Sequence, residues 1–228
     1  MSITTGLTWI FIFVAIVFFI LILKDKKIKV KKVIFFGDSI TEFGTQPKGY
    51  ISAIREMLHY QNIENLELIN AGVSGDKVND LLLRMHDVIT QSPDIVVLWI
   101  GVNDVWQTNN LFAEPDTTEF EKDYTTIVKA LLAKNINLVL VTPAVVGEKK
   151  DNSNPLDESL EKHCEVIRSI ADEFKLLLCD MQAFFHLYEL KYNKVNAIKG
   201  ILTVDGVHLN DMGNRFAANE ILKIVKEI

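Results

Sequence analysis

Three side chains that can together activate a hydroxyl group stand in two short stretches of this chain. Ser39 lies in "VIFFGDSITEFG", residues 33–44, and Asp205 precedes His208 by three positions in "DGVHLNDMGN", residues 205–214. A serine hydroxyl is a weak nucleophile until an imidazole takes its proton, and a carboxylate commonly holds that imidazole in one tautomer. The pattern predicts ester hydrolysis with Ser39 as nucleophile, His208 as general base and Asp205 as orienting carboxylate.

Such a reaction also needs hydrogen-bond donors for the negative oxygen of the tetrahedral intermediate. Gly75 lies in "NAGVSGDK", residues 70–77, and Asn103 lies in "GVND", residues 101–104. A glycine allows the backbone to approach a substrate and to adopt positive φ. We expect the backbone N–H groups of Ser39 and Gly75 and the side-chain amide of Asn103 to form this oxyanion hole.

The residues around these motifs predict a sheet that brings them together. Short apolar runs that suit strands buried on both faces alternate with segments of helical periodicity, which is typical of a parallel sheet covered by helices. The predicted strands are 32–36, 66–70, 95–100, 138–142 and 176–180, and the predicted helices are 50–60, 77–89, 120–134, 156–174, 183–190 and 211–226. The expected fold class is α/β, a three-layer α/β/α sandwich with a five-stranded parallel sheet.

Each of the first three chemical motifs directly follows a predicted strand. In an open parallel sheet the carboxyl ends of all strands lie along one edge, and ligands bind in the crevice there. We therefore expect Ser39, Gly75 and Asn103 to become neighbours at this edge. The motif with Asp205 and His208 precedes the last predicted helix.

The four blocks "FFGDSITE", "NAGVSGDK", "IGVND" and "DGVHLN" resemble those of the SGNH (GDSL-type) hydrolase superfamily, in the order that the family has them. The resemblance covers residues 33–228. It implies a flavodoxin-like fold, carboxylic ester hydrolysis without a cofactor, and the roles given above for Ser39, Gly75, Asn103, Asp205 and His208. Family members often have proline after the histidine, where this chain has Leu209.

The amino-terminal segment predicts a membrane anchor. Residues 7–23 contain no charged residue, and at about 1.5 Å per residue they span roughly 25 Å as a helix. No Lys or Arg precedes this run and no small-x-small cleavage site follows it, so an uncleaved transmembrane helix is favoured over a signal peptide or a buried core helix. We expect residues 1–32 to be an anchor with a basic juxtamembrane segment and residues 33–228 to be the hydrolase domain.

Charge divides the chain in the same way. Residues 24–32 hold six lysines and one aspartate, and taking these from the chain totals of 24 basic and 30 acidic residues leaves a net charge of −11 from Val33 onward. So acidic a domain argues against nucleic acid as a partner. The lysines suit anionic lipid headgroups, and the positive-inside rule favours a single-pass protein whose domain faces the cytoplasm. Cys164 and Cys179 are expected in the core.

Two other kinds of function fit parts of the pattern. Asp38, Asp104, Asp180 and Asp205 could line one edge and hold Mg²⁺ for phosphoryl transfer, although no phosphate-binding glycine loop accompanies them. A membrane-tethered binding module on an inactive hydrolase scaffold is the other alternative. If serine performs the chemistry, Asp38 and Asp104 are expected to cap helices or bind loop N–H groups, and no metal is needed.

The substrate is an ester whose identity the motifs leave open. The family resemblance implies short-chain acyl esters, lysophospholipids, thioesters or acetylated sugars. Trp106, Leu111 and Phe112, which follow the third motif, could receive an acyl chain or simply pack their loop. Because the predicted anchor brings the domain near a bilayer, a lipid or other acyl ester is favoured over a carbohydrate acetyl ester. The sequence does not indicate an oligomeric state.

Overall fold

A computed structural model describes residues 29–106 and 116–228. Within them, five parallel strands form one sheet, as predicted, and their order is β2-β1-β3-β4-β5. Each strand begins within one residue of its predicted start. The strands are β1 (Lys31–Gly37), β2 (Leu66–Gly72), β3 (Ile95–Trp99), β4 (Asn137–Val141) and β5 (Leu177–Cys179).

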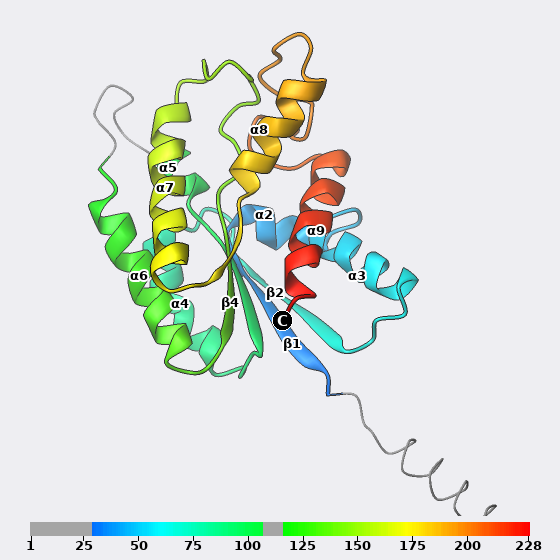
Figure 1. Cartoon of the computed structure of the whole chain (residues 1–228), viewed down its shortest axis with the longest axis vertical. Coiled ribbons are helices and arrows are strands. Elements are labelled where there is room, and N and C mark those ends of the chain that lie inside the picture. The colour runs from blue at the N-terminus through cyan, green and yellow to red at the C-terminus, as the bar shows by residue number, and fades with distance from the viewer. Residues whose placement is uncertain (1–28, 107–115) are drawn as a thin grey trace, which may run out of the picture. The chain divides into compact units, whose positions relative to one another are not determined.

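Helices cover both faces of the sheet, which confirms the three-layer α/β fold (Figure 1). In β1 the side chains of Val33 and Phe35 pack with one buried cluster, and those of Ile34 and Phe36 pack with another. The first cluster includes residues of α3 (Tyr50–Tyr60) and α9 (Asp211–Val225), and the second includes residues of α4 (Val78–Ile89), α6 (Thr118–Leu132) and α7 (Asp157–Glu173). Strands buried on both faces are continuously apolar for this reason.

Short helices near the sheet edge were absent from the prediction. They are α2 (Ser39–Glu42), the 3₁₀ helix η1 (Phe43–Thr45) and α5 (Val102–Trp106). Each has at most five residues, so it completes too few turns for a hydrophobic period to show in the sequence. Another helix, α8 (Met181–Tyr192), begins two residues before its predicted start.

The strand order identifies where a ligand can enter. From β1 the chain crosses to β2 on one side and then returns to form β3 on the other side. The crevice outside the carboxyl ends of such a pair is the usual binding position in open α/β sheets. Ser39 follows β1 and Asn103 follows β3 at this position.

The predicted transmembrane helix over residues 7–23 lies outside the described residues, as do Leu111 and Phe112. None of the helices within residues 29–106 and 116–228 is long and apolar enough to cross a membrane. Cys164 and Cys179 are free and fully buried in the core, which confirms the position expected for them.

Candidate active site

Ser39 is the first residue of α2 and lies directly beyond the end of β1. Asp38 is the N-cap of this helix, and its Oδ1 accepts a hydrogen bond of 3.0 Å from the N–H of Ile40. The turn requires glycine at position 37, because a Cβ there would lie 2.2 Å from the carbonyl oxygen of Trp99. The capping role expected for Asp38 is confirmed, and the turn leaves the buried Ser39 hydroxyl facing His208.

A row of polar contacts joins the three predicted catalytic side chains. The Ser39 Oγ lies 3.0 Å from His208 Nε2, and His208 Nδ1 lies 2.7 Å from Asp205 Oδ2. Because an ionised carboxylate can only accept, Nδ1 must carry the proton in this contact. Neutral His208 then has its lone pair on Nε2, and Ser39 donates its hydroxyl hydrogen to it. The arrangement suits proton transfer from the hydroxyl to the imidazole.

Hydrogen bonds keep Asp205 in its ionised form. Partial burial would raise the pKa of the Asp205 carboxyl, but hydrogen bonds from the His208 ring and from the N–H groups of His208 and Val207 lower it below its ordinary value. One carboxylate oxygen holds the backbone and the other holds the imidazole. Asp205 therefore fixes both the position of the histidine and its tautomer.

The loop that carries Asp205 and His208 is held by a buried carboxylate that sequence reasoning missed. Glu148 is fully buried, and its two oxygens accept hydrogen bonds from three successive N–H groups, those of residues 201–203. Thr203 in turn accepts a hydrogen bond from the N–H of Gly206. Three charge-assisted bonds to consecutive backbone groups make Glu148 a strong anchor for this loop.

The two glycines of the second motif have different structural roles. A Cβ on Gly72 would lie 2.1 Å from the backbone nitrogen of Glu42, so this glycine allows α2 to pack on the end of β2. Gly75 has φ +87° and no atom within 4 Å of the position its Cβ would take. Glycine is therefore favoured at position 75 by the positive φ of the backbone, and not because a side chain would clash with neighbouring atoms. Of the two, Gly75 lies in the open part of the loop, where the sequence placed the oxyanion donor.

Asn103 is tied to the same loop. Its side-chain nitrogen Nδ2 donates a hydrogen bond of 2.9 Å to the carbonyl of Asp76, the residue after Gly75. An amide NH₂ group has two hydrogens, so one of them is used to fix the side chain and the second is available to a ligand.

The remaining aspartates have structural partners, which does not favour the metal-dependent alternative. Asp104 accepts a hydrogen bond from the N–H of Val78 at the start of α4, and Asp180 binds the guanidinium of Arg168. No group of three potential ligands for a metal ion is present among the described residues. Trp106, the described member of the predicted substrate pocket, ends α5 and is 55% exposed.

Arg84 on α4 is a further residue of the site that the sequence analysis missed. Its Nε donates to Asp76 at 2.6 Å, and its two other nitrogens donate to the carbonyls of Ala71 and Gly37 at 2.8 and 2.9 Å. The guanidinium thus joins the ends of β1 and β2 to the loop that Asn103 also holds. The sequence signal that could have indicated this role is the position of Arg84, three residues after Leu81. Arg84 therefore lies on the same face of the predicted amphipathic helix as residues that pack in the core.

Arg84→Lys is expected to lower kcat by about tenfold to a hundredfold with little change in KM, because lysine cannot make three bonds in the geometry of a guanidinium. Removal of one oxyanion donor costs about 10²–10³ in kcat, and misplacing donors should cost less. Steady-state kinetics on a soluble acetyl ester would measure the change. Arg55→Lys on the exposed face of α3 is the matched control. An unchanged kcat, or a rise in KM alone, would contradict a positioning role.

The Asp38 carboxyl should make stability depend on pH. Burial raises the pKa of Asp38 to about 7 from an ordinary value of 3.8, against the lowering effects of the Ile40 N–H and of His208. Between these two values the folded state holds a proton that the unfolded state releases, so stability falls as pH rises from about 4 to about 7. Above pH 7 the full cost of the buried charge is present.

Asp38→Asn retains an oxygen for the N–H of Ile40 but has no charge. Its gain in unfolding free energy over the original protein should therefore be small at pH 5 and should reach the order of a few kcal/mol at pH 8. Thermal unfolding followed by circular dichroism across this range measures it. A difference that is the same at every pH would show that charge burial at Asp38 is not responsible.

The sheet order, the position of Ser39 past β1 and its contact with His208 define the class of this protein, an α/β ester hydrolase of the SGNH type. The chain belongs to the GDSL-like Lipase/Acylhydrolase family, which matches residues 35–216. Both findings confirm the resemblance seen in the four sequence blocks and make the protein a carboxylic ester hydrolase.

Several similar proteins are described as esterases. An acetylxylan esterase of Geobacillus stearothermophilus is 31% identical over 174 residues, which cover 68% of this chain and 78% of that protein. The isoamyl acetate-hydrolyzing esterase 1 homolog of Bos taurus is 24% identical over 86% of this chain and 82% of its own length. The crystal structure of the acetyl xylan esterase AlAXEase has a TM-score of 0.82 and 45% identity, covering 85% of this chain and 99% of that one.

Proposed function

We propose that this protein removes acetyl groups from carbohydrates by a serine mechanism in which Ser39, His208 and Asp205 act together. The observation that carries the proposal is the row of contacts from Ser39 Oγ through the two His208 nitrogens to Asp205, with distances of 3.0 and 2.7 Å. Similarity to two acetylxylan esterases supports an acetylated sugar as the substrate.

In this mechanism the Ser39 oxygen attacks the carbonyl carbon of the acetyl ester while His208 Nε2 takes the hydroxyl proton. The N–H groups of Ser39 and Gly75 and the second amide hydrogen of Asn103 stabilise the resulting oxyanion. His208 then gives its proton to the sugar oxygen as the C–O bond breaks, which leaves an acetyl group on Ser39. A water molecule, deprotonated by His208, releases acetate and restores the serine.

Solved structures of a related enzyme support the roles of the three side chains. Structures of an acetylxylan esterase from Geobacillus stearothermophilus include catalytic mutants in which a serine, an aspartate or a histidine is replaced by alanine. The aspartate and the histidine of that enzyme lie three positions apart, as do Asp205 and His208 here.

We propose an acetylated carbohydrate as the substrate, in place of the acyl lipid that the sequence analysis favoured. Lipid was favoured because a predicted anchor brings the domain near a bilayer. However, two relatives at 31% and 45% identity are acetylxylan esterases, and this similarity supports an acetyl ester of a carbohydrate more directly than a predicted anchor supports a lipid.

We further propose that residues 7–23 anchor the protein in a membrane and that the lysines of residues 24–32 lie at the lipid headgroups. Support for this comes from the uncharged apolar run and the lysine cluster that follows it.

The test compares substrates on the full-length protein in detergent. Acetylated xylan and p-nitrophenyl acetate should be hydrolysed with a higher kcat/KM than p-nitrophenyl octanoate or a lysophospholipid. A fluorophosphonate probe, which reacts with activated serines, should label the protein, and the label should be absent from Ser39→Ala. A clear preference for the octanoate or the lysophospholipid would exclude an acetyl esterase. Activity that a chelator abolishes, without labelling, would exclude the serine mechanism.

A further inference from the structure

A cavity of about 640 Å³ lies beside the loop that carries Asp205 and His208. We call it the α7–α8 cavity, because residues of α7, α8 and the loop of residues 144–154 line it. Ser39, Asp205 and His208 are not among the lining residues. The volume is within the range of cavities that bind small molecules.

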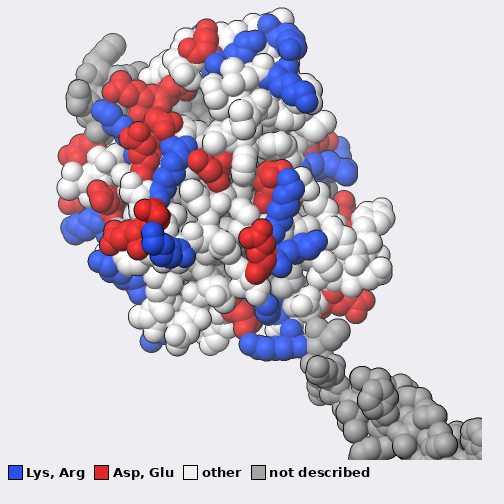
Figure 2. Space-filling view, viewed as in Figure 1, with Lys and Arg blue, Asp and Glu red and all other residues white. Residues whose placement is uncertain are grey.

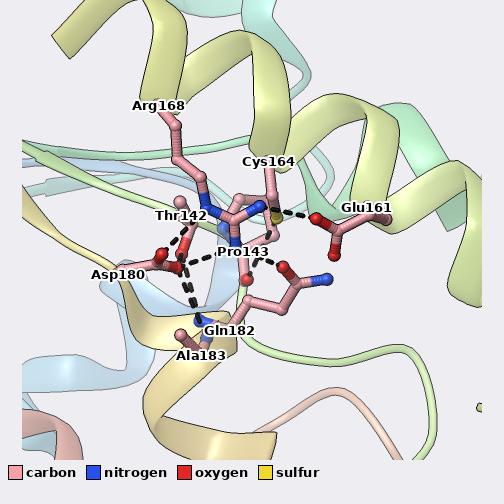
Figure 3. A network of polar contacts seen from close by, with 8 residues as sticks. All are labelled: Thr142, Pro143, Glu161, Cys164, Arg168, Asp180, Gln182 and Ala183. Atoms are coloured by element: carbon pink, nitrogen blue, oxygen red, sulfur yellow. Dashed lines mark hydrogen bonds and ion pairs between the residues drawn. The ribbon is translucent and has the colours of Figure 1, made fainter. Parts of the chain in front are cut away.

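Two polar side chains on facing helices of the cavity are held by one arginine. Arg168 donates to Glu161 Oε1 at 2.7 Å and to Gln182 Oε1 at 2.6 Å. Its other bonds go to the two oxygens of Asp180, at 2.8 and 3.0 Å. Asp180 is itself fixed by the Thr142 hydroxyl and the N–H of Ala183 (Figure 3). Figure 3 shows Glu161 and Gln182 on the same side of the arginine.

This network leaves a donor and an acceptor side by side on the cavity wall. The Gln182 Nε2 group and the second carboxylate oxygen of Glu161 make no hydrogen bond within the described chain. Because Arg168 already holds both side chains in place, little conformational entropy is lost when a ligand binds them. An amide donor next to a carboxylate acceptor can bind neighbouring hydroxyl groups, each of which both donates and accepts.

The charge of the cavity argues for a neutral ligand. Five acidic and three basic side chains line it, but burial raises the pKa of Glu189 to about 8, so four acidic charges face three basic ones at neutral pH. Two of the basic residues, Lys162 and Arg168, are paired with acidic neighbours. Acidic side chains gather over α7 in the space-filling view (Figure 2). A lining whose charges nearly balance suits a neutral ligand, and the C–H faces of a sugar could contact the apolar lining residues Ala144, Val145 and Leu160.

The cavity adjoins the loop that carries the catalytic histidine. Gly147 lines the cavity, and its N–H donates a hydrogen bond of 2.8 Å to the carbonyl of Gly206, the residue after Asp205. A Cβ on Gly206 would lie 3.5 Å from the Gly147 Cα, so the two loops are in contact. The wall of the cavity is thus hydrogen-bonded directly to the loop that carries Asp205 and His208.

We propose that the α7–α8 cavity binds an unacetylated segment of a neutral glycan chain, with Glu161 and Gln182 contacting its hydroxyl groups. This inference rests on the proposed carbohydrate acetylesterase function. It adds a binding site separate from the residues that perform the reaction. A polymer held there keeps its acetylated units near Ser39, which raises their local concentration.

Two substitutions of almost identical shape test the site on the full-length protein. Glu161→Gln replaces an acceptor oxygen with a donor, and Gln182→Glu removes the amide donor but keeps an oxygen for Arg168. Each should raise KM for acetylated xylan about threefold to tenfold, the usual effect of losing one or two hydrogen bonds. Kinetic constants for p-nitrophenyl acetate should not change. Glu173→Gln, at an exposed position of α7 outside the cavity, is the matched control.

Direct binding separates this inference from the proposed function. Isothermal titration with xylotetraose should show binding to the original protein that weakens by a similar factor in both variants. No binding, or equal binding to all proteins, would overturn the glycan site even if acetylated xylan is a substrate. A parallel rise in KM for p-nitrophenyl acetate would also overturn it, because that result indicates damage at Ser39. If xylotetraose binds but no acetylated glycan is hydrolysed, the site stands and the proposed function fails.

Discussion

Ser39→Ala is expected to lower kcat for acetyl ester hydrolysis by roughly four to six orders of magnitude, the range found when a serine nucleophile is removed. The Ser39 oxygen is the only atom of the three-residue row that would form a bond to the substrate. Alanine leaves His208 with no hydroxyl to deprotonate. The few remaining interactions, those of the oxyanion donors, stabilise attack by water only weakly. Hydrolysis of p-nitrophenyl acetate by highly purified protein would measure this loss.

Ser169→Ala, at an exposed position of α7, is the control for the loss of a hydroxyl elsewhere. The thermal unfolding midpoints of the two variants should both lie close to that of the original protein, so that inactivity cannot be due to unfolding. A Ser39→Ala variant that retains a tenth of the original kcat would exclude Ser39 as nucleophile.

Asp205→Asn should lower kcat by about 10³- to 10⁴-fold while KM changes little. The carboxylate oxygen Oδ1 accepts the N–H groups of Val207 and His208, so the amide oxygen should take this position in the variant. The amide nitrogen then faces His208 Nδ1 and donates to it. His208 must therefore carry its proton on Nε2, where it can no longer accept the proton of Ser39.

Asp211→Asn provides the control, since Asp211 is an exposed acid three residues after His208 whose side chain contacts Lys48. Its kcat should equal that of the original protein. NMR of the imidazole nitrogens would show the proton on Nδ1 in the original protein and on Nε2 in Asp205→Asn. A kcat within threefold of the original value in Asp205→Asn would remove Asp205 from the mechanism.

Glu148 and Asp38 are both buried near the site, but they affect folding stability differently because they accept different numbers of hydrogen bonds. Glu148 accepts three backbone N–H groups, whereas Asp38 accepts one and has a pKa raised by burial. Buried charges are tolerated where hydrogen bonds replace water. Glu148 therefore stabilises the loop that carries Asp205 and His208, while Asp38 lowers stability at neutral pH and caps the helix that begins at Ser39.

The amino-acid sequence by itself determined the layers of the fold and the three side chains of the row. Apolar runs and helical periodicity are local properties, so strands such as β1 and helices such as α3 could be read from consecutive residues. The motifs around Ser39, Asn103 and His208 could be placed because each follows a strand or precedes a helix. Parallel strands share one edge, and this rule was enough to predict that Ser39 and Asn103 are neighbours.

Only the tertiary structure decided which residues hold those side chains in position. Arg84 binds the carbonyl of Gly37, 47 positions earlier, and Glu148 binds an N–H group 53 positions later. The α7–α8 cavity likewise depends on how two helices and the loop after β4 come together in space. Such contacts depend on the packing of whole elements in space, which no local pattern of residues specifies.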